Sequence, residues 1–237
     1  MKEYKDVIGI VGGMGSFATL DFFGRVLRAF PAVKEWERPR VLIDNRCTMP
    51  SRVRAILYHE QVEYVTECLV ESTRNLLHGG ATVLILACNT SHFFLDRILE
   101  RVPEARGKFI NIIESIGGGL MPLEKGQKYL LLASEGTLAS GIYQKYFAKY
   151  DVQLDIPDES VYPRLRDIIE DVKQDRISDD TVEAFIQLIT SFGRYHVILG
   201  CTEFPAVYEK CKSSKKFQGY HIYDPLEYAI QGKCLIT

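Results

Sequence analysis

Two cysteines occupy matching positions in two similar stretches of the chain. Cys88 follows the apolar run "TVLILA" and Cys201 follows "HVILG", and each precedes small polar residues and then a predicted helix. A thiol at the start of a helix is made more acidic by the backbone amides and the helix dipole, and the thiolate is the reactive form. The pattern therefore predicts two reactive thiols rather than two core residues.

Three kinds of chemistry could use such a pair. A redox disulfide is disfavoured because the usual Cys-x-x-Cys spacing is absent. Zinc is disfavoured because only His92 and Glu203 lie near the cysteines in sequence, and "CNTSH" is not a usual zinc spacing. Proton transfer on two faces of one carbon acid fits best, with one thiolate, one thiol and a shared titration. We therefore expect no metal site and a reaction that inverts a stereocentre.

The other cysteines fit ordinary structural roles. Six cysteines in a chain of this length do not make a disulfide framework, and a lone buried cysteine is usually a small core residue. We predict that role for Cys47, Cys68, Cys211 and Cys234.

The hydrophobic pattern alternates between short apolar runs and amphipathic stretches. We predict strands over 6–11, 40–45, 82–88, 109–113, 128–134, 196–201 and 221–224, and helices over 16–30, 58–78, 91–102, 138–150, 162–174, 179–193 and 204–211. Such alternation is typical of βαβ units and mostly parallel sheets, in which ligands bind beyond the carboxyl ends of the strands. Both cysteines of the pair stand at such ends.

The alternation also repeats along the chain. The stretches "GIVGGMG" and "LILACNT" in the first part correspond to "LLLASEGT" and "VILGCTE" in the second. We therefore predict two similar α/β halves that face each other across a cleft. Residues 1–108 together with 216–237 would form the half that carries Cys88, and residues 109–215 the half that carries Cys201.

A glycine-rich loop follows the first predicted strand. Its Gly13-x-Gly15-x-x-Ala18 spacing resembles the dinucleotide fingerprint, and Asp44 at the end of the next strand could bind a ribose. The alternative is a tight strand–helix turn whose amides bind a small anion such as a carboxylate. We favour the second interpretation, because a cysteine pair has no evident role in a nucleotide-dependent dehydrogenase.

The composition is that of an ordinary globular protein. Of 237 residues, 46% are hydrophobic and 25% are charged, and the formal net charge is -2. This charge gives no basic footprint for nucleic acid, and no apolar run reaches the ~20 residues that span a bilayer. The N-terminus leads into a strand without a signal-peptide pattern. We expect a cytoplasmic protein with no nucleic-acid or membrane partner.

Five motifs together resemble one protein family. The motifs "GGMGSFAT", "MPSR", "ACNTSH", "EGTLASGIY" and "GCTEF" occur in this order over nearly the whole chain. In this combination the chain closely resembles the aspartate racemases of the cofactor-independent Asp/Glu racemase superfamily. The glutamate racemases of that superfamily differ, since they begin with a "DSG"-type loop and end on "GCTH".

The resemblance implies a fold, a reaction and a partner. The fold is two pseudo-symmetric Rossmann-like α/β domains with mostly parallel sheets and an active site between the domains. The reaction is the interconversion of L- and D-aspartate, or of the glutamate enantiomers, with Cys88 and Cys201 as the two acid/base residues and without pyridoxal phosphate or another cofactor. The partner is a small acidic amino acid, and relatives commonly form homodimers.

The resemblance also implies which residues bind the substrate. Arg52 of "MPSR" would grip one carboxylate, as arginine does in bidentate pairs, and Lys173 would contact the distal carboxylate. Met14 and Gly13 would close over the substrate. The amino and carboxylate groups would be held by four polar side chains: Asn89, Thr90, Thr137 and Thr202.

Some positions depart from the family pattern or have no assigned chemistry. Ser51 replaces the acidic residue before the family's arginine, Arg46 is an additional arginine near the substrate, and "EYAIQGKCLIT" lacks the expected Ala-rich helix. We expect His92 to bond locally, and Glu203 to orient Thr202 or the nearby helix end. The departures bear on the choice of substrate and leave both catalytic positions intact. Two alternatives to a racemase remain: a related isomerase or decarboxylase acting on a small dicarboxylate, and a non-catalytic protein that binds an acidic metabolite.

Overall fold

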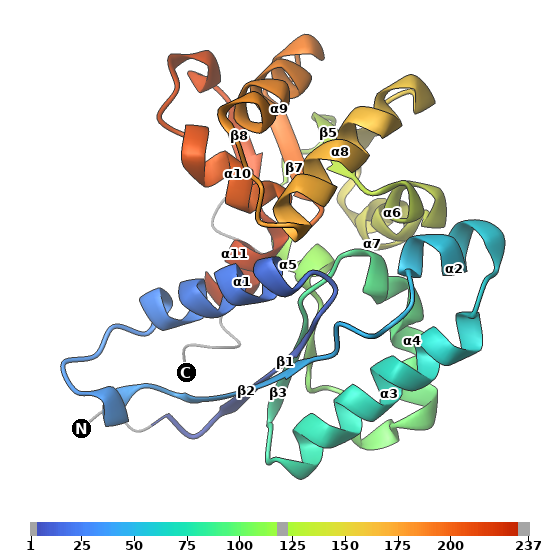
Figure 1. Ribbon diagram of the computed structural model, residues 1–237, viewed down its shortest axis with the longest axis vertical. Coiled ribbons are helices and arrows are strands. Elements are labelled where there is room, and N and C mark those ends of the chain that lie inside the picture. The colour runs from blue at the N-terminus through green and yellow to red at the C-terminus, as the bar shows by residue number, and fades with distance from the viewer. Residues whose placement is uncertain (1–3, 118–122, 232–237) are drawn as a thin grey trace.

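Two parallel sheets form the framework of the protein (Figure 1). The structure is a computed structural model that describes residues 4–117 and 123–231. The first sheet has the strand order β2-β1-β3-β4 and the second β6-β5-β7-β8, and each pairing is parallel. The strands are β1 (Val7–Gly12), β2 (Arg40–Asn45), β3 (Val83–Leu86), β4 (Phe109–Ile110), β5 (Lys128–Ala133), β6 (Gln153–Asp155), β7 (His196–Gly200) and β8 (His221–Tyr223). Both sheets have the same order, which confirms the predicted α/β fold with two similar halves.

Helices connect the strands of each sheet. Those of the first half are α1 (Ser16–Ala29), α2 (Arg52–Tyr58), α3 (Val62–His78), α4 (Leu95–Arg101) and α5 (Ile112–Gly117). Those that follow are α6 (Glu135–Ser140), α7 (Ile142–Phe147), α8 (Tyr162–Lys173), α9 (Asp179–Ser191), α10 (Phe204–Cys211) and α11 (Pro225–Gln231). The helix predicted over 138–150 is divided at Gly141, whose φ of 64° ends one helix and begins the next.

Three apolar clusters hold the helices to the sheets. Side chains alternate between the two faces of a strand, so Ile8 and Ile10 of β1 enter a central cluster together with Tyr129 and Leu131 of β5. That cluster also contains residues of α1, α5, α7 and α11, and Figure 1 shows α1, α5 and α11 where the two halves meet. The outer clusters lie under α3 and α4 in one half and under α8, α9 and α10 in the other. The halves therefore share one core, which fixes the cleft between them.

The sheets divide the chain differently from the predicted boundary. Strand β4 pairs with β3, so the first sheet extends beyond residue 108. Strand β8 pairs with β7 in the second sheet, although its residues were assigned to the first half. Helix α11, which was assigned to the first half, contacts α5, α1 and also β7 of the second sheet. Strands of two or three residues carry too short a pattern to indicate their sheet, and residues 232–237 lie outside the described part.

Among the described residues, no helix combines the length and the apolar character needed to cross a membrane.

Candidate active site

The repeated strand order brings the two cysteines to one place. Cys88 comes just after β3 and Cys201 directly after β7, and these strands hold equivalent positions in their sheets. The two side chains are 5% and 8% exposed. Both line one cavity of about 50 Å³ between the two halves. Each half thus contributes one thiol, from the carboxyl end of a central strand, to a single site.

Most of the predicted substrate-binding residues line the same cavity. They are Met14, Arg52, Asn89, Thr90, Lys173 and Thr202. Gly13 and Thr137 do not line it. The remaining wall comes from five residues that were not predicted to bind substrate: Ser51, Val53, Ser134, Ile169 and Glu203. Ser134 could have been found from the sequence, because it is the first polar residue after the apolar run of β5.

Glu203 lies against Cys201 in the second half. Its Oε2 accepts hydrogen bonds from Cys201 Sγ at 2.9 Å and from Thr202 Oγ1 at 3.3 Å. Burial raises the pKa of the Cys201 thiol well above its ordinary value, and the negative charges of Glu203 and of a Cys88 thiolate raise it further. Cys201 is therefore held as a thiol at neutral pH. The contact with Thr202 agrees with the predicted role of Glu203, whereas the contact with the cysteine was not predicted.

His92 forms a hydrogen bond with the backbone next to the first cysteine. Its Nδ1 lies 3.0 Å from the carbonyl oxygen of Cys88, at the 3-10 helix Thr90–Phe94. Burial lowers the pKa of His92 to about 4, so the imidazole is neutral and donates to this carbonyl. This is the local role expected for His92.

Among the described residues, no three His, Cys, Asp or Glu side chains are grouped as a metal site would require.

Arg52 is fixed by the backbone of two loops. Its Nη2 donates to the carbonyl oxygen of Met14 at 2.8 Å and its Nη1 to that of Pro50 at 3.1 Å. Its Nε is buried and has no partner in the described protein. The guanidinium is thus held rigidly at the cavity wall with a donor to spare, which suits a carboxylate ligand.

Further donors face the cavity from the two halves. Asn89 accepts a hydrogen bond from Tyr143 Oη at 2.7 Å, and its buried Nδ2 has no partner in the described protein. Three hydroxyls form a cluster, in which Thr90 Oγ1 lies 2.8 Å from Thr137 Oγ1 and 3.0 Å from Ser134 Oγ. Thr137 thus contacts two residues that line the cavity, Thr90 and Ser134.

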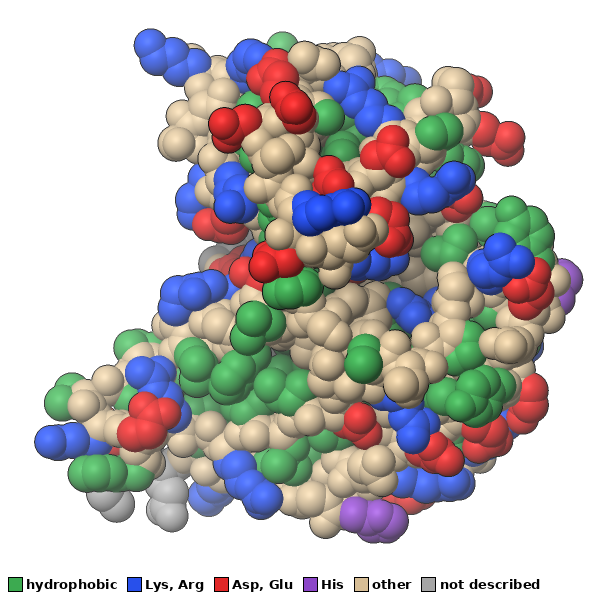
Figure 2. All heavy atoms as spheres, in the orientation of Figure 1, with side chains coloured by type: hydrophobic (Ala, Val, Ile, Leu, Met, Phe, Trp, Pro, Cys, Tyr) green, Lys and Arg blue, Asp and Glu red, His purple; other side chains and the backbone are tan. Residues whose placement is uncertain are grey.

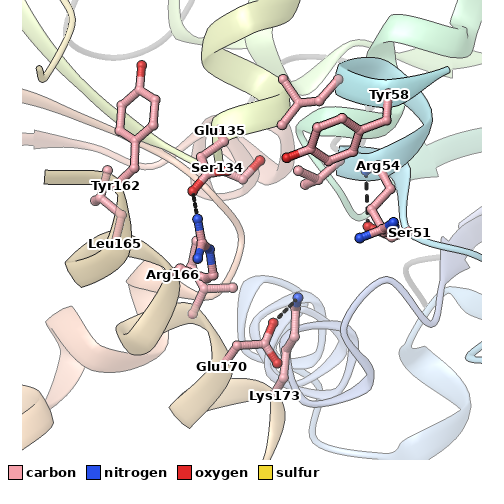
Figure 3. Close-up of a pocket in the computed structure, with 13 residues that line it drawn as sticks. Ser51, Arg54, Tyr58, Ser134, Glu135, Tyr162, Leu165, Arg166, Glu170 and Lys173 are labelled. Atoms are coloured by element: carbon pink, nitrogen blue, oxygen red, sulfur yellow. Dashed lines mark hydrogen bonds and ion pairs between the residues drawn. The ribbon is translucent and has the colours of Figure 1, made fainter. Parts of the chain in front are cut away.

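Lys173 stands where the cavity meets a larger hollow between α2, α6 and α8 (Figure 3). This hollow has about 380 Å³ and shares Ser51, Val53, Ser134, Ile169 and Lys173 with the inner cavity. Figure 3 shows Lys173 and Glu170 turned toward each other, with Nζ 2.8 Å from Oε1. The space-filling view shows the surface hollowed between the two halves, with basic side chains nearby (Figure 2). The inner cavity is therefore reached from this side.

Comparison with known proteins identifies the family. The model of the family described as Asp/Glu/Hydantoin racemase matches residues 11–231. This chain belongs to the Asp/Glu/hydantoin racemase family. The resemblance seen in the sequence motifs is thereby confirmed.

Two solved structures share the fold of this chain. The chain is similar to the aspartate racemase of Picrophilus torridus, with 24% identity, a TM-score of 0.74 and coverage of 93% of this chain and 89% of that one. It is also similar to an aspartate racemase homologue from Pyrococcus horikoshii, with 21% identity, a TM-score of 0.66 and coverage of 97% and 96%. The two-domain α/β architecture is therefore that of the family.

Glutamate racemases are similar over a part of their length. One from Staphylococcus aureus is 26% identical over 153 residues, which are 62% of this chain and 55% of that protein. One from Corynebacterium kroppenstedtii is 25% identical over 134 residues, which are 55% of this chain and 45% of that protein. The match thus spans about half the length of these glutamate racemases.

The glycine-rich loop of this family member is a tight turn. Gly13 has φ of 81°, and its N–H donates to Thr19 Oγ1 at 3.1 Å. Asp44 accepts a hydrogen bond from Asn75 Nδ2 at 3.2 Å. Because the first amide of the loop and the candidate ribose carboxylate are both engaged within the protein, the geometry favours the tight turn over a dinucleotide site.

We predict that Gly13→Ala lowers the free energy of unfolding by about 3 kcal/mol, the sum of left-handed strain and a forced clash. A Cβ at Gly13 would lie 2.4 Å from the carbonyl carbon of Arg46. The matched control is Gly107→Ala, where φ is 74° but no atom of the described residues, apart from the two chain neighbours, lies within 4 Å of the added Cβ, and about 1 kcal/mol is expected. Urea unfolding measures both values, and equal losses would show that the contact with Arg46 costs nothing.

The remaining cysteines are not part of the cavity. Cys68 and Cys211 are buried, as predicted for core residues, and neither lines the cavity. Cys47 is exposed, so the core role predicted for it is wrong: it follows β2 in a loop that turns toward solvent. Cys234 lies outside the described residues.

Proposed function

We propose that the protein interconverts the enantiomers of an acidic amino acid, aspartate or glutamate, by proton transfer at Cα without a cofactor. The observation that carries the proposal is the meeting of two buried cysteines, from equivalent strands of the two sheets, in one cavity. One thiolate would remove the Cα proton, and the opposite thiol would protonate the other face. Two bases on two sides of one carbon give inversion, which is what a racemase requires.

The other groups of the cavity suit the charges of such a substrate. Arg52 would hold the α-carboxylate through its free Nε–H and stabilise the enolate-like state that forms there. Asn89 and the hydroxyl of Thr90 would bond the amino or carboxylate groups. Lys173 would attract the distal carboxylate from the boundary of the two spaces. Burial opposes the charge of Lys173, but Glu170, Glu203 and Cys201 outweigh it and raise the pKa of its ammonium group.

The size of the spaces orients the substrate. The inner cavity of about 50 Å³ has room for one or two water molecules, since one water takes about 30 Å³ in the liquid. The adjoining hollow of about 380 Å³ supplies the rest of the room. The reacting carbon would therefore lie inside and the side-chain carboxylate toward the hollow, where aspartate and its longer homologue glutamate both have space.

We also propose that the protein works in the cytoplasm as a homodimer. The cysteines of the described part are free thiols, which is the usual state in a reducing compartment. The dimer is proposed from the resemblance to relatives that pair, and light scattering of the purified protein tests it.

Incubation in D2O without added cofactor tests the proposed function. With L-aspartate and L-glutamate in separate samples, we expect loss of the Cα proton signal by NMR and appearance of the D-form by chiral chromatography. The faster reaction identifies the preferred substrate. Exchange of neither acid would contradict the proposal, and tight aspartate binding without exchange would favour a binding protein.

A further inference from the structure

Glu203 is a buried carboxylate in the wall of the cavity, and binding of the substrate by Arg52 and Lys173 does not explain it. Its side chain is 2% exposed, and its Oε1 is buried without a hydrogen-bond partner in the described protein. Its Oε2 accepts a hydrogen bond from the Cys201 thiol and a longer one from the Thr202 hydroxyl. Burial of a carboxylate with one unpaired oxygen costs free energy. A stability role therefore does not account for this residue.

The loop opposite Glu203 leaves room for the carboxylate. A Cβ at Gly15 would lie 2.9 Å from Glu203 Oε1 and 3.4 Å from Lys173 Cγ. The glycine of the first half thus allows a carboxylate of the second half to reach across the cleft. Burial lowers the pKa of the Lys173 ammonium group on α8, but its ion pair with Glu170 and the nearby negative charges of Glu203 and Cys201 raise it overall.

The surroundings of the two thiols differ in one respect. Cys201 donates to a carboxylate, whereas no carboxylate within the described ranges hydrogen-bonds to Cys88 Sγ. Besides burial, Glu203 in the following turn and Cys88 after β3 raise the pKa of Cys201, and the charge of Cys201 in turn raises the pKa values of Lys173 on α8 and Tyr143 of α7. Glu203 is therefore what makes the two sides of the cavity unequal.

We propose that Glu203 is a positioning residue that keeps the proton on Cys201 in the free enzyme, and so makes Cys88 the base that meets the first substrate. This inference rests on the proposed function. In the first half-reaction the Cα–H bond breaks and an S–H bond forms at Cys88. The S–H bond of Cys201 breaks as the new C–H bond forms on the opposite face, and Glu203 remains a carboxylate throughout.

The removal of the negative charge gives the test. In Glu203→Gln the amide keeps the size of the side chain, and its oxygen can still accept a hydrogen bond from the thiol. A carboxylate beside the thiol disfavours its thiolate, so the loss of the carboxylate should lower the pKa of Cys201. The variant is made in a Cys88→Ser background, where Cys201 is the one remaining thiol of the described residues that lines the cavity. Alkylation of Cys201 by iodoacetamide is then followed by mass spectrometry from pH 6 to 11.

The expected result is a midpoint for Cys201 alkylation that moves to lower pH in Glu203→Gln by about one pH unit. Glu170→Gln is the matched control, because Glu170 contacts Lys173 and makes no hydrogen bond with Cys201. Glu203→Asp, which keeps the charge, should hold the midpoint closer to that of the parent and serves also if the amide variant does not fold. An unchanged or higher midpoint in Glu203→Gln would overturn the proposal. The Cys88→Ser background cannot racemise by two bases, and the alkylation of Cys201 is measured without substrate. This outcome is therefore independent of whether the protein is a racemase.

Discussion

Replacement of Cys88 by serine is expected to reduce racemisation at least ~1000-fold, and replacement of Cys201 to reduce it equally. The two thiols are the only cysteine side chains of the described part that line the cavity. General acid–base groups contribute roughly 100- to 10,000-fold to a rate. A serine hydroxyl does not lose its proton at neutral pH, so it cannot replace a thiolate as the base. Loss of either thiol leaves one face of Cα without its proton donor or acceptor.

The measurement combines chiral chromatography with proton exchange in D2O. Cys201→Ser should still exchange the Cα proton of one enantiomer, because Cys88 remains to remove it, and Cys88→Ser should at most exchange that of the other. Cys47→Ser is the matched control, since this thiol is exposed and lies outside the cavity, and it should racemise as the unaltered protein does. Full activity in either cavity variant would contradict the two-thiol mechanism.

The position of the thiols follows from features that a sequence displays directly. An apolar run that ends on a cysteine before a helix places the thiol at the carboxyl edge of a parallel sheet. The second copy of the pattern then predicts a second thiol at the same edge of a second sheet. Arg52 could be placed only through the resemblance, since its neighbours Met14 and Pro50 meet it through backbone carbonyls that no side-chain pattern indicates.

Other features depend on packing that a sequence does not display. Strands β4 and β8 are too short for their periodicity to show which sheet they join. The contact between Glu203 and Cys201 depends on both side chains turning inward from one tight turn, and on the absence of a side chain at Gly15. Gly13 shapes a turn and Thr137 bonds to Thr90, and neither lines the cavity, so their roles in binding stay predictions.

Replacement of Arg52 by lysine is expected to raise the KM for the acidic amino acid roughly 10- to 100-fold. A hydrogen bond to a charged group contributes roughly 1.5–3 kcal/mol. The ammonium group of lysine is a point charge that lacks the planar fork with which a guanidinium group places its donors on separate acceptors. In the structure those carbonyls belong to Met14 and Pro50, and they occupy both Nη groups while Nε remains free. The ammonium group of the variant would bind the carbonyls or the substrate carboxylate, but not all three in this geometry.

Steady-state kinetics with each enantiomer measure this effect, and the result separates binding from scaffolding. If Arg52 acts on the carboxylate, the KM of the folded protein rises, whether or not the unfolding midpoint in urea also falls. If Arg52 only anchors the loop at Met14, the midpoint falls and the KM of the folded fraction stays constant. Arg74→Gln is the matched control: its exposed side chain on α3 donates to the carbonyl oxygen of Arg101, away from the cavity, so neither quantity should change. A KM that stays constant in Arg52→Lys would contradict the carboxylate role and move the search for the anion-binding group to Lys173.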